Sequence, residues 1–243
     1  MKKTGKNAAL APPAPPAPLI AGVIVDGLDR GVARRALNSG AGLLELRIDT
    51  FRNRSVGPLA EEVRGLKSRG WAADVPLIIT VRSSAEGGKF SMGDKRRKEI
   101  FTALMEWADY IDIELSSAAA FKDVISTARR KGKQVILSYH NFASTPTSGA
   151  LAKLVKRARG AGADIVKIAA AVKTPGELKR LCSLLGEHKN LIVIAMGRFG
   201  RSSRVFFPIL GSLMTYGSVT ESTAPGQLSV RTIKKEFELY GIE

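Results

Sequence analysis

The sequence predicts an α/β fold, an eight-stranded parallel β/α (TIM) barrel that forms a single domain over residues 19–243. Three observations predict it. Short apolar, β-branched runs recur eight times, a stretch with helical periodicity separates most neighbouring runs, and the runs are apolar along their whole length. Continuously apolar strands are typical of parallel sheets covered on both faces. Eight such units in roughly 250 residues are typical of a closed barrel, whose site lies at the carboxyl ends of the strands.

The alternative to the barrel is an open, doubly wound sheet. Such sheets often carry a Gly-rich phosphate-binding turn after their first strand. The segment VDGLDRG, which follows the first apolar run here, lacks the required glycine spacing. This omission favours the barrel.

The strands are predicted where β-branched and apolar residues concentrate between polar or Gly-containing boundaries. In chain order these runs are Leu19–Val25, Leu43–Ile48, Pro76–Val81, Tyr110–Leu115, Gln134–Tyr139, Ile165–Ala169, Leu191–Ala195 and Tyr216–Thr220.

Helices are predicted between the strands, where apolar residues recur with a helical period and basic residues form the outer face. These stretches are Gly31–Asn38, Leu59–Ser68, Lys95–Trp107, Ala118–Lys131, Leu151–Arg159 and Pro175–Leu185.

Composition restricts the classes of partner. The net charge of +16 attracts anions of any kind, but the basic residues are scattered over predicted helix faces and only 6% of residues are aromatic. A stacking platform for nucleic acid is therefore not apparent, and we expect a small anionic substrate and no nucleic acid. No run approaches the roughly 20 apolar residues of a membrane span, so no membrane partner is expected.

The first 18 residues differ in composition from the rest. Pro12, Pro13, Pro15 and Pro16 interrupt the apolar part of this segment, so it lacks the continuous apolar region of a signal peptide. We predict a disordered Ala/Pro-rich tail over residues 1–18, and a cytoplasmic protein.

Metal and disulfide chemistry are not expected. Cys182 is the only cysteine, in the helix-like context LKRLCSLL, where core packing explains it. His140 and His188 are the only histidines, which leaves no multi-histidine or cysteine cluster for a metal.

Two ionisable residues interrupt the apolar runs near the middle of the chain. His140 ends the run Gln134–Phe142, and Lys167 lies within Ala163–Ala171, where its neighbours predict burial. Taken one at a time, His140 could be a hydrogen-bonded structural residue, and Lys167 could extend its ammonium group to the surface. Adjacent parallel strands would instead deliver both side chains to one end of the sheet, a pairing suited to imine chemistry with a proton shuttle.

Further polar residues occur at the ends of the other predicted strands. They must be paired or used if they point into a barrel. These residues are Glu45, Arg47 and Asp49 at alternating positions of the second run, Arg82 and the loop with Glu86 after the third, and Asp112 and Glu114 on the fourth.

Two Gly-containing segments after the last strands are predicted as loops, residues 196–204 (MGRFGRSSR) and 222–227 (STAPGQ). Gly and Pro favour turns here. Arg204 precedes an apolar stretch and is placed to bind a carboxylate or phosphate through its planar guanidinium.

Together, these residues make the chain resemble the type I 3-dehydroquinate dehydratases of the shikimate pathway, from about Leu19 to the C-terminus. Each motif alone is weak, but their order and spacing are specific. They are ELRID at Glu45, TVR and EGG within Thr80–Gly88, SYHNF at Ser138, IVKIA around Lys167, MG at Met196, SR at Ser203, GS at Gly211, TY at Thr215 and APGQ at Ala224.

The resemblance implies a homodimeric lyase that removes water from 3-dehydroquinate without a metal or organic cofactor. Lys167 is expected to form a Schiff base with the ketone, while burial and cationic neighbours disfavour its ammonium form. His140 is the expected acid and base, with Glu86 positioning it or relaying protons and Glu114 as a further orienting residue. The implied substrate-binding residues are Glu45, Arg47, Arg82, Arg204, Thr223, Gln227 and Met196.

The chain departs from the family pattern in two places near these residues. Asn141 follows the histidine where the family commonly has Asp, and Thr223 stands where Ser is usual. Two other functions remain open at this point. A class I aldolase also uses a strand lysine on a β/α barrel, and the high positive charge permits a nucleic-acid-binding protein with a decayed site.

Overall fold

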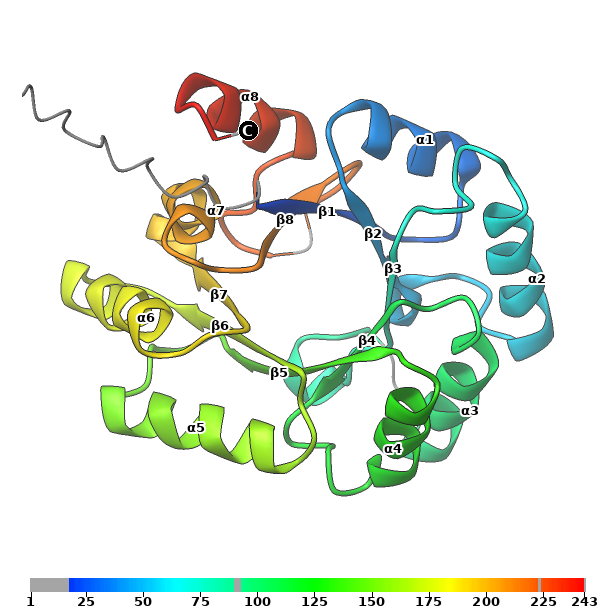
Figure 1. Ribbon diagram of the computed structural model, residues 1–243, viewed down its shortest axis with the longest axis horizontal. Helices are drawn as coiled ribbons and strands as arrows, with labels where there is room; N and C mark the ends of the chain where they lie inside the picture. The colour runs from blue at the N-terminus through cyan, green and yellow to red at the C-terminus, as the bar shows by residue number, and fades with distance from the viewer. Residues whose placement is uncertain (1–17, 90–92, 223, 243) are drawn as a thin grey trace, which may run out of the picture.

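The computed structural model describes residues 18–89, 93–222 and 224–242. In Figure 1 the strands form a central ring and the helices surround it. The strands are β1 (Leu19–Ile24), β2 (Leu43–Arg47), β3 (Leu77–Thr80), β4 (Tyr110–Glu114), β5 (Gln134–Asn141), β6 (Ile165–Ala171), β7 (Leu191–Met196) and β8 (Met214–Ser218). The α-helices are α1 (Arg30–Asn38), α2 (Val56–Lys67), α3 (Asp94–Leu104), α4 (Lys122–Arg130), α5 (Ser148–Gly160), α6 (Pro175–Glu187), α7 (Gly200–Ile209) and α8 (Val230–Leu239).

The strands pair in parallel in the order β7-β6-β5-β4-β3-β2-β1-β8. The first and last strands of this series are joined more sparsely than the others. The Leu213 amide donates to the Leu191 carbonyl at 2.9 Å, and the Val193 amide donates to Ser212 Oγ at 3.0 Å. These bonds nearly close the ring, and the predicted β/α barrel is confirmed.

Side chains alternate between the two faces of each strand, and this alternation divides the core. On β7, Leu191 and Val193 belong to the apolar cluster that lies between the strands and the helices. Ile192 and Ile194 belong to the second cluster, which fills the barrel interior. The apolar strand runs therefore reflect burial on both faces.

The barrel interior changes character along its axis. Toward the amino ends of the strands it contains apolar residues such as Leu43, Ile78 and Ile136. At the next positions on the same faces it contains buried polar residues. These are Glu45, Thr80, Asp112, Ser138 and Lys167, each at most 4% exposed. Parallel strands thus concentrate the polar groups at one end of the barrel.

The loop predicted over residues 196–204 is wrong in its second half, where helix α7 begins at Gly200. Ser203, in the first turn, donates a hydrogen bond to the Gly200 carbonyl at 2.9 Å, and its Oγ accepts from the Ala195 amide at 3.3 Å. Val205 and Phe207 are buried against the barrel, which gives the helix an apolar face. Arg204 therefore lies on a helix held against β7.

Helices α7 and α8 are additional to the six that the sequence predicts, and β8 lies two residues earlier than its predicted run. Ser229 begins α8 by accepting a hydrogen bond from the Thr232 amide at 3.1 Å. The predicted tail lies almost wholly outside the described residues. Within the described ranges, no helix is long and apolar enough to cross a membrane, and no group of three or more His, Cys, Asp or Glu side chains could hold a metal ion.

Candidate active site

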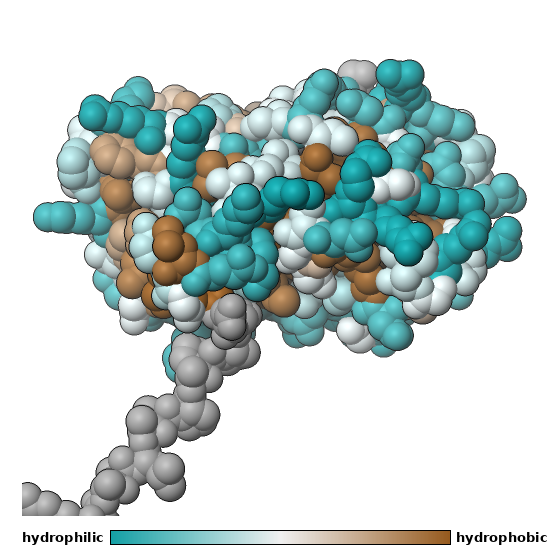
Figure 2. All heavy atoms as spheres, turned by 90° about the horizontal axis from the view of Figure 1, so that it is seen from above, coloured by the Kyte–Doolittle hydropathy of each residue, from teal (hydrophilic) through white to brown (hydrophobic). Residues whose placement is uncertain are grey.

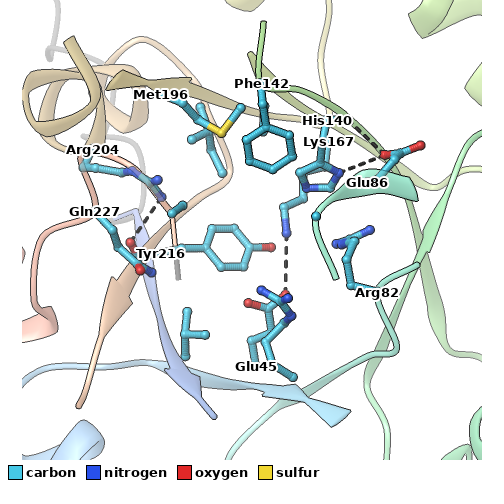
Figure 3. Close-up of a pocket in the computed structure, with 16 residues that line it drawn as sticks. Glu45, Arg82, Glu86, His140, Phe142, Lys167, Met196, Arg204, Tyr216 and Gln227 are labelled. Atoms are coloured by element: carbon cyan, nitrogen blue, oxygen red, sulfur yellow. Dashed lines mark hydrogen bonds and ion pairs between the residues drawn. The ribbon is translucent and has the colours of Figure 1, made fainter. Parts of the chain in front are cut away.

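A pocket opens at the polar end of the barrel. Figure 3 shows side chains from strands around the ring converging on it. Its lining residues include nine of the ten predicted site residues, namely Glu45, Arg47, Arg82, Glu86, His140, Lys167, Met196, Arg204 and Gln227. The tenth, Thr223, lies outside the described residues. A pocket in which a few polar side chains converge is typical of a small-molecule site.

Lys167 extends from the middle of β6 into the pocket and is 4% exposed. Its Nζ donates to Asp112 Oδ2 at 2.9 Å and lies 3.6 Å from Glu45 Oε1. On another side it lies 4.0 Å from the centre of the Tyr216 ring. These contacts hold the Nζ atom of Lys167 in one position within the pocket.

The expectation of burial and cationic neighbours around Lys167 is incomplete. The structure also places two carboxylates, those of Asp112 and Glu45, beside the amine. Both carboxylates help to hold the lysine nitrogen in place.

A buried ion network surrounds Asp112. Its Oδ1 lies 2.9 Å from Arg82 and accepts a hydrogen bond from Ser138 Oγ at 2.7 Å. Burial alone would raise the pKa of Asp112, but Arg82 and Lys167 outweigh it and hold this pKa well below its usual range. Asp112 is therefore a permanent anion at the base of the pocket.

His140 is the penultimate residue of β5, and its imidazole lies in the same pocket. Glu86 Oε2 lies 3.0 Å from His140 Nδ1 and accepts from the His140 backbone amide at 3.0 Å. Because a carboxylate accepts, Nδ1 carries the proton and Nε2 is left as the basic nitrogen. Ser116 fixes the other Glu86 oxygen with a 2.7 Å hydrogen bond.

Two environments shift the pKa values of this pair in opposite directions. Burial, together with the positive charges of Arg82 and Lys167, lowers the pKa of His140 well below its usual value. Burial raises the pKa of Glu86, although the Ser116 hydrogen bond and Arg82 oppose the shift. The neutral imidazole is the form that can accept a proton.

Phe142, two residues after His140, covers one side of the pair. Its ring stacks on the imidazole with centroids 6.5 Å apart and planes 18° from parallel. Gly87 makes this approach possible, because a Cβ there would lie 2.7 Å from the Phe142 ring. Gly87 also has a φ of 83°, in the left-handed region that glycine favours.

Arg204 enters the pocket from the opposite side and is 2% exposed. Its guanidinium donates to the Tyr216 carbonyl at 3.3 Å, while its Nε has no hydrogen-bond partner. Figure 3 shows Gln227 beside it. Among the described residues no carboxylate lies within ion-pair distance of Arg204. Burial accordingly lowers the pKa of Arg204 to about 10.

Glycines at the start of α7 and in the 224–227 segment bring Arg204 and Gln227 to this side. A Cβ at Gly200 would lie 2.9 Å from the Gly226 Cα, and one at Gly226 would lie 2.8 Å from the Gly200 Cα. The two backbones can approach so closely only because both residues lack side chains.

Several predicted roles change in the structure. Glu114, expected to orient His140, instead lies 2.9 Å from Arg82 NH1 and also pairs with Arg97 of α3. Asn141 accepts hydrogen bonds from the Ala143 and Ser144 amides and donates to the Tyr139 hydroxyl at 3.0 Å. An ionised Asp could not make that donation.

Glu45 and Arg47 both line the pocket, as predicted, but they have different partners. Glu45 accepts from Thr80 Oγ1 at 2.8 Å, whereas Arg47 pairs with Asp49 at 2.7 Å. Sequence reasoning assigned no site role to Tyr216 or Phe142. Side chains alternate between the two faces of a strand, and this alternation along β8 would have predicted that Tyr216 points into the barrel.

The fold and the site together define a class of protein. A buried strand lysine, beside a histidine held neutral, at the carboxyl end of a β/α barrel is the arrangement of barrel enzymes that act through a lysine imine. Comparison with known proteins narrows this class.

The family model for type I 3-dehydroquinase matches residues 29–243. The chain is 37% identical to 3-dehydroquinate dehydratase of Methanosarcina barkeri over 218 residues, which cover 86% of this chain and 89% of the relative. It is 33% identical to the enzyme of Thermodesulfovibrio yellowstonii over 229 residues, covering 93% and 96%.

Solved structures agree with these relatives. The crystal structure of 3-dehydroquinate dehydratase from Aquifex aeolicus matches with a TM-score of 0.81 and 31% identity, covering 91% of this chain and 98% of that one. The Clostridium difficile type I enzyme with covalently modified comenic acid matches with a TM-score of 0.84 and 25% identity, covering 93% of each chain. The chain belongs to the type I 3-dehydroquinase family.

The environment of His140 predicts a pH dependence. Because the pKa of His140 is lowered, its neutral, basic form persists below pH 6.5. We therefore expect the decrease of kcat/KM in acid that reports this residue to have its midpoint below pH 6.5. We expect the imidazole signals of His140 in NMR spectra to titrate in the same range. With only two histidines in the chain, a His188→Gln variant assigns the spectrum. Titration of His140 at or above pH 6.5 would contradict the assignment.

Proposed function

We propose that Lys167 and His140 carry out the dehydration that defines the family, the conversion of 3-dehydroquinate to 3-dehydroshikimate and water. The family acts through a Schiff base. The observation that carries the assignment is a single one. Lys167, on β6, points into the pocket beside neutral His140 on β5, and Glu86, from the loop after β3, holds the imidazole.

The reaction begins with a nucleophilic addition. The deprotonated Nζ of Lys167 attacks the ketone carbon, and loss of the ketone oxygen as water gives a protonated imine. The positive imine withdraws electrons and makes the neighbouring C–H bond more acidic. His140 Nε2 removes that proton, because Nδ1 is already committed to Glu86 at 3.0 Å.

The second half of the reaction uses the proton that His140 has gained. The electron pair of the former C–H bond forms the new double bond, and the hydroxyl on the next carbon leaves as water with the proton from His140. Hydrolysis of the imine then releases the product and restores the amine of Lys167. Glu86 positions the imidazole throughout and stabilises its protonated state.

Substrate recognition follows from the charge arrangement. Of the four cationic side chains that line the pocket, Arg204 is the one without a carboxylate partner among the described residues, so it is the proposed partner of the substrate carboxylate. Gln227 lies beside it and Met196 lines the same pocket. Arg82, Glu45 and Arg47 are proposed to contact ring hydroxyls, and Thr223 keeps the binding role that the resemblance implies.

The class I aldolase is the other imine-forming function that the fold permits. Membership of the dehydroquinase family excludes it as the main activity. In this proposal Arg204 and Gln227, which match the family motifs, bind a carboxylate rather than a sugar phosphate.

The nucleophile can be identified directly. Incubation with 3-dehydroquinate and sodium borohydride is expected to reduce the imine and give a mass increase that peptide mapping assigns to Lys167. Lys167→Ala is expected to lose the adduct and about 10⁴-fold or more in kcat. Lys173→Ala, which changes an exposed lysine, serves as the control and keeps both. An adduct on another lysine, or dehydration by Lys167→Ala, would overturn the assignment.

The role of Arg204 predicts a change in KM. Arg204→Gln removes the charge that binds the substrate carboxylate, so we expect KM to rise about 10- to 100-fold with a smaller change in kcat. Arg201→Gln changes an exposed arginine of the same helix and is the matched control. Equal KM values for the two variants, measured by steady-state kinetics, would disprove the contact.

We also propose that the protein is a cytoplasmic homodimer, as the resemblance implies. In Figure 2 brown apolar patches interrupt the hydrophilic surface. Supporting self-association, Phe206 and Tyr240 pack against each other with centroids 5.5 Å apart while 43% and 52% exposed. Sedimentation equilibrium is expected to give twice the 26.0 kDa chain mass. A single-chain mass at micromolar concentration would contradict the dimer.

A further inference from the structure

The hydroxyl of Tyr216 is buried in the pocket without a hydrogen-bond partner. Tyr216 lies on β8, is 3% exposed and lines the same pocket as Lys167. Among the described residues nothing accepts from or donates to its Oη. Figure 3 shows the ring crossing the pocket floor, with its oxygen directed toward the end of Lys167.

Packing alone does not explain this hydroxyl. A buried polar group without a hydrogen-bond partner lowers the stability of the folded protein, whereas a phenylalanine ring would fill almost the same space without that cost. The side chain already belongs to the apolar cluster of the barrel interior, which also contains Met214 and Ile192. The hydroxyl therefore destabilises the free protein and requires another reason to be there.

The position of the ring relative to Lys167 supplies that reason. Lys167 Nζ lies 4.0 Å from the ring centroid, while carboxylates occupy other sides of the amine at 2.9 and 3.6 Å. A carbon that bonds to Nζ must approach from the open part of the pocket. The ketone oxygen is bonded to that carbon, and it therefore lies in the part of the pocket that is next to the Tyr216 hydroxyl.

The chemistry of Tyr216 restricts it to donating. Burial, followed by the negative charges of Glu45 and Asp112, raises the pKa of Tyr216 well above its usual value. The phenol therefore keeps its proton throughout the working pH range. It can stabilise a developing negative charge on an oxygen, but it cannot act as a general base.

We propose that the Tyr216 hydroxyl donates a hydrogen bond to the oxygen of the ketone that Lys167 attacks. This inference rests on the proposed function. As the bond from Nζ to the ketone carbon forms, the C=O π bond breaks and its electron pair moves to the oxygen. That oxygen takes up the proton released by the attacking nitrogen, which completes a neutral carbinolamine, and Tyr216 retains its own proton. Tyr216 thus contacts the substrate and accelerates imine formation.

The variant Tyr216→Phe removes only the hydroxyl and tests this role. We expect the rate of imine formation, followed by borohydride quenching and intact mass spectrometry in single turnovers, to fall about 10- to 100-fold. Because the lost hydroxyl is unpaired, the midpoint of thermal unfolding is expected to stay the same or rise. Tyr110→Phe, at the opposite end of the barrel, is the matched control and keeps the wild-type rate.

The remaining outcomes overturn the proposal. Imine formation at the wild-type rate, or a slower rate accompanied by a lower unfolding midpoint, would show that the hydroxyl does not contact the ketone oxygen. Normal imine formation with slower loss of the ring hydroxyl would place the contact elsewhere on the substrate. Failure of the wild-type protein to form any Lys167 adduct would instead refute the proposed function, so the two failures are distinguishable.

Discussion

The buried ion pair between Arg82 and Asp112 is the interaction on which the polar end of the barrel depends. Both side chains are at most 4% exposed and their charged atoms are 2.9 Å apart. Taking either charge out of water alone would be costly, and removal of one partner leaves the other uncompensated. Asp112 in turn holds Lys167, and Arg82 also binds Glu114. The placement of the Lys167 amine therefore follows from a network that joins β4 and β6 to the segment after β3.

The same network sets the protonation state of the histidine. Arg82 has two carboxylate partners, yet its charge still acts on the imidazole of His140, which is buried and less strongly compensated. A histidine in this field remains neutral where an isolated one would begin to gain a proton. Glu86 orients the ring without cancelling the effect. Structural ion pairs and acid–base chemistry are thus coupled through one arginine.

The sequence predicted the fold because each strand is buried on both faces and reads as an apolar run. It also placed His140 and Lys167 together, since parallel strands bring their carboxyl ends to one edge. It missed helix α7, whose Gly- and Arg-rich start reads as a loop until Ser203 ties it to β7. The partners of Lys167 were missed for another reason. Asp112 lies two strands away, and only the barrel register determines which inward residues meet.

The two sides of the pocket differ in charge balance, and this difference explains how one site can bind an anion while working through an amine. On the side of β2 to β4, the arginines Arg47 and Arg82 are matched by carboxylates at 2.7 and 2.9 Å. On the side of α7, Arg204 has no such match among the described residues, and burial makes its charge costly. The proposed binding of the substrate carboxylate at Arg204 would lower this cost. In that proposal the rest of the ring extends across Tyr216 toward Lys167, which orients the ketone before any bond forms.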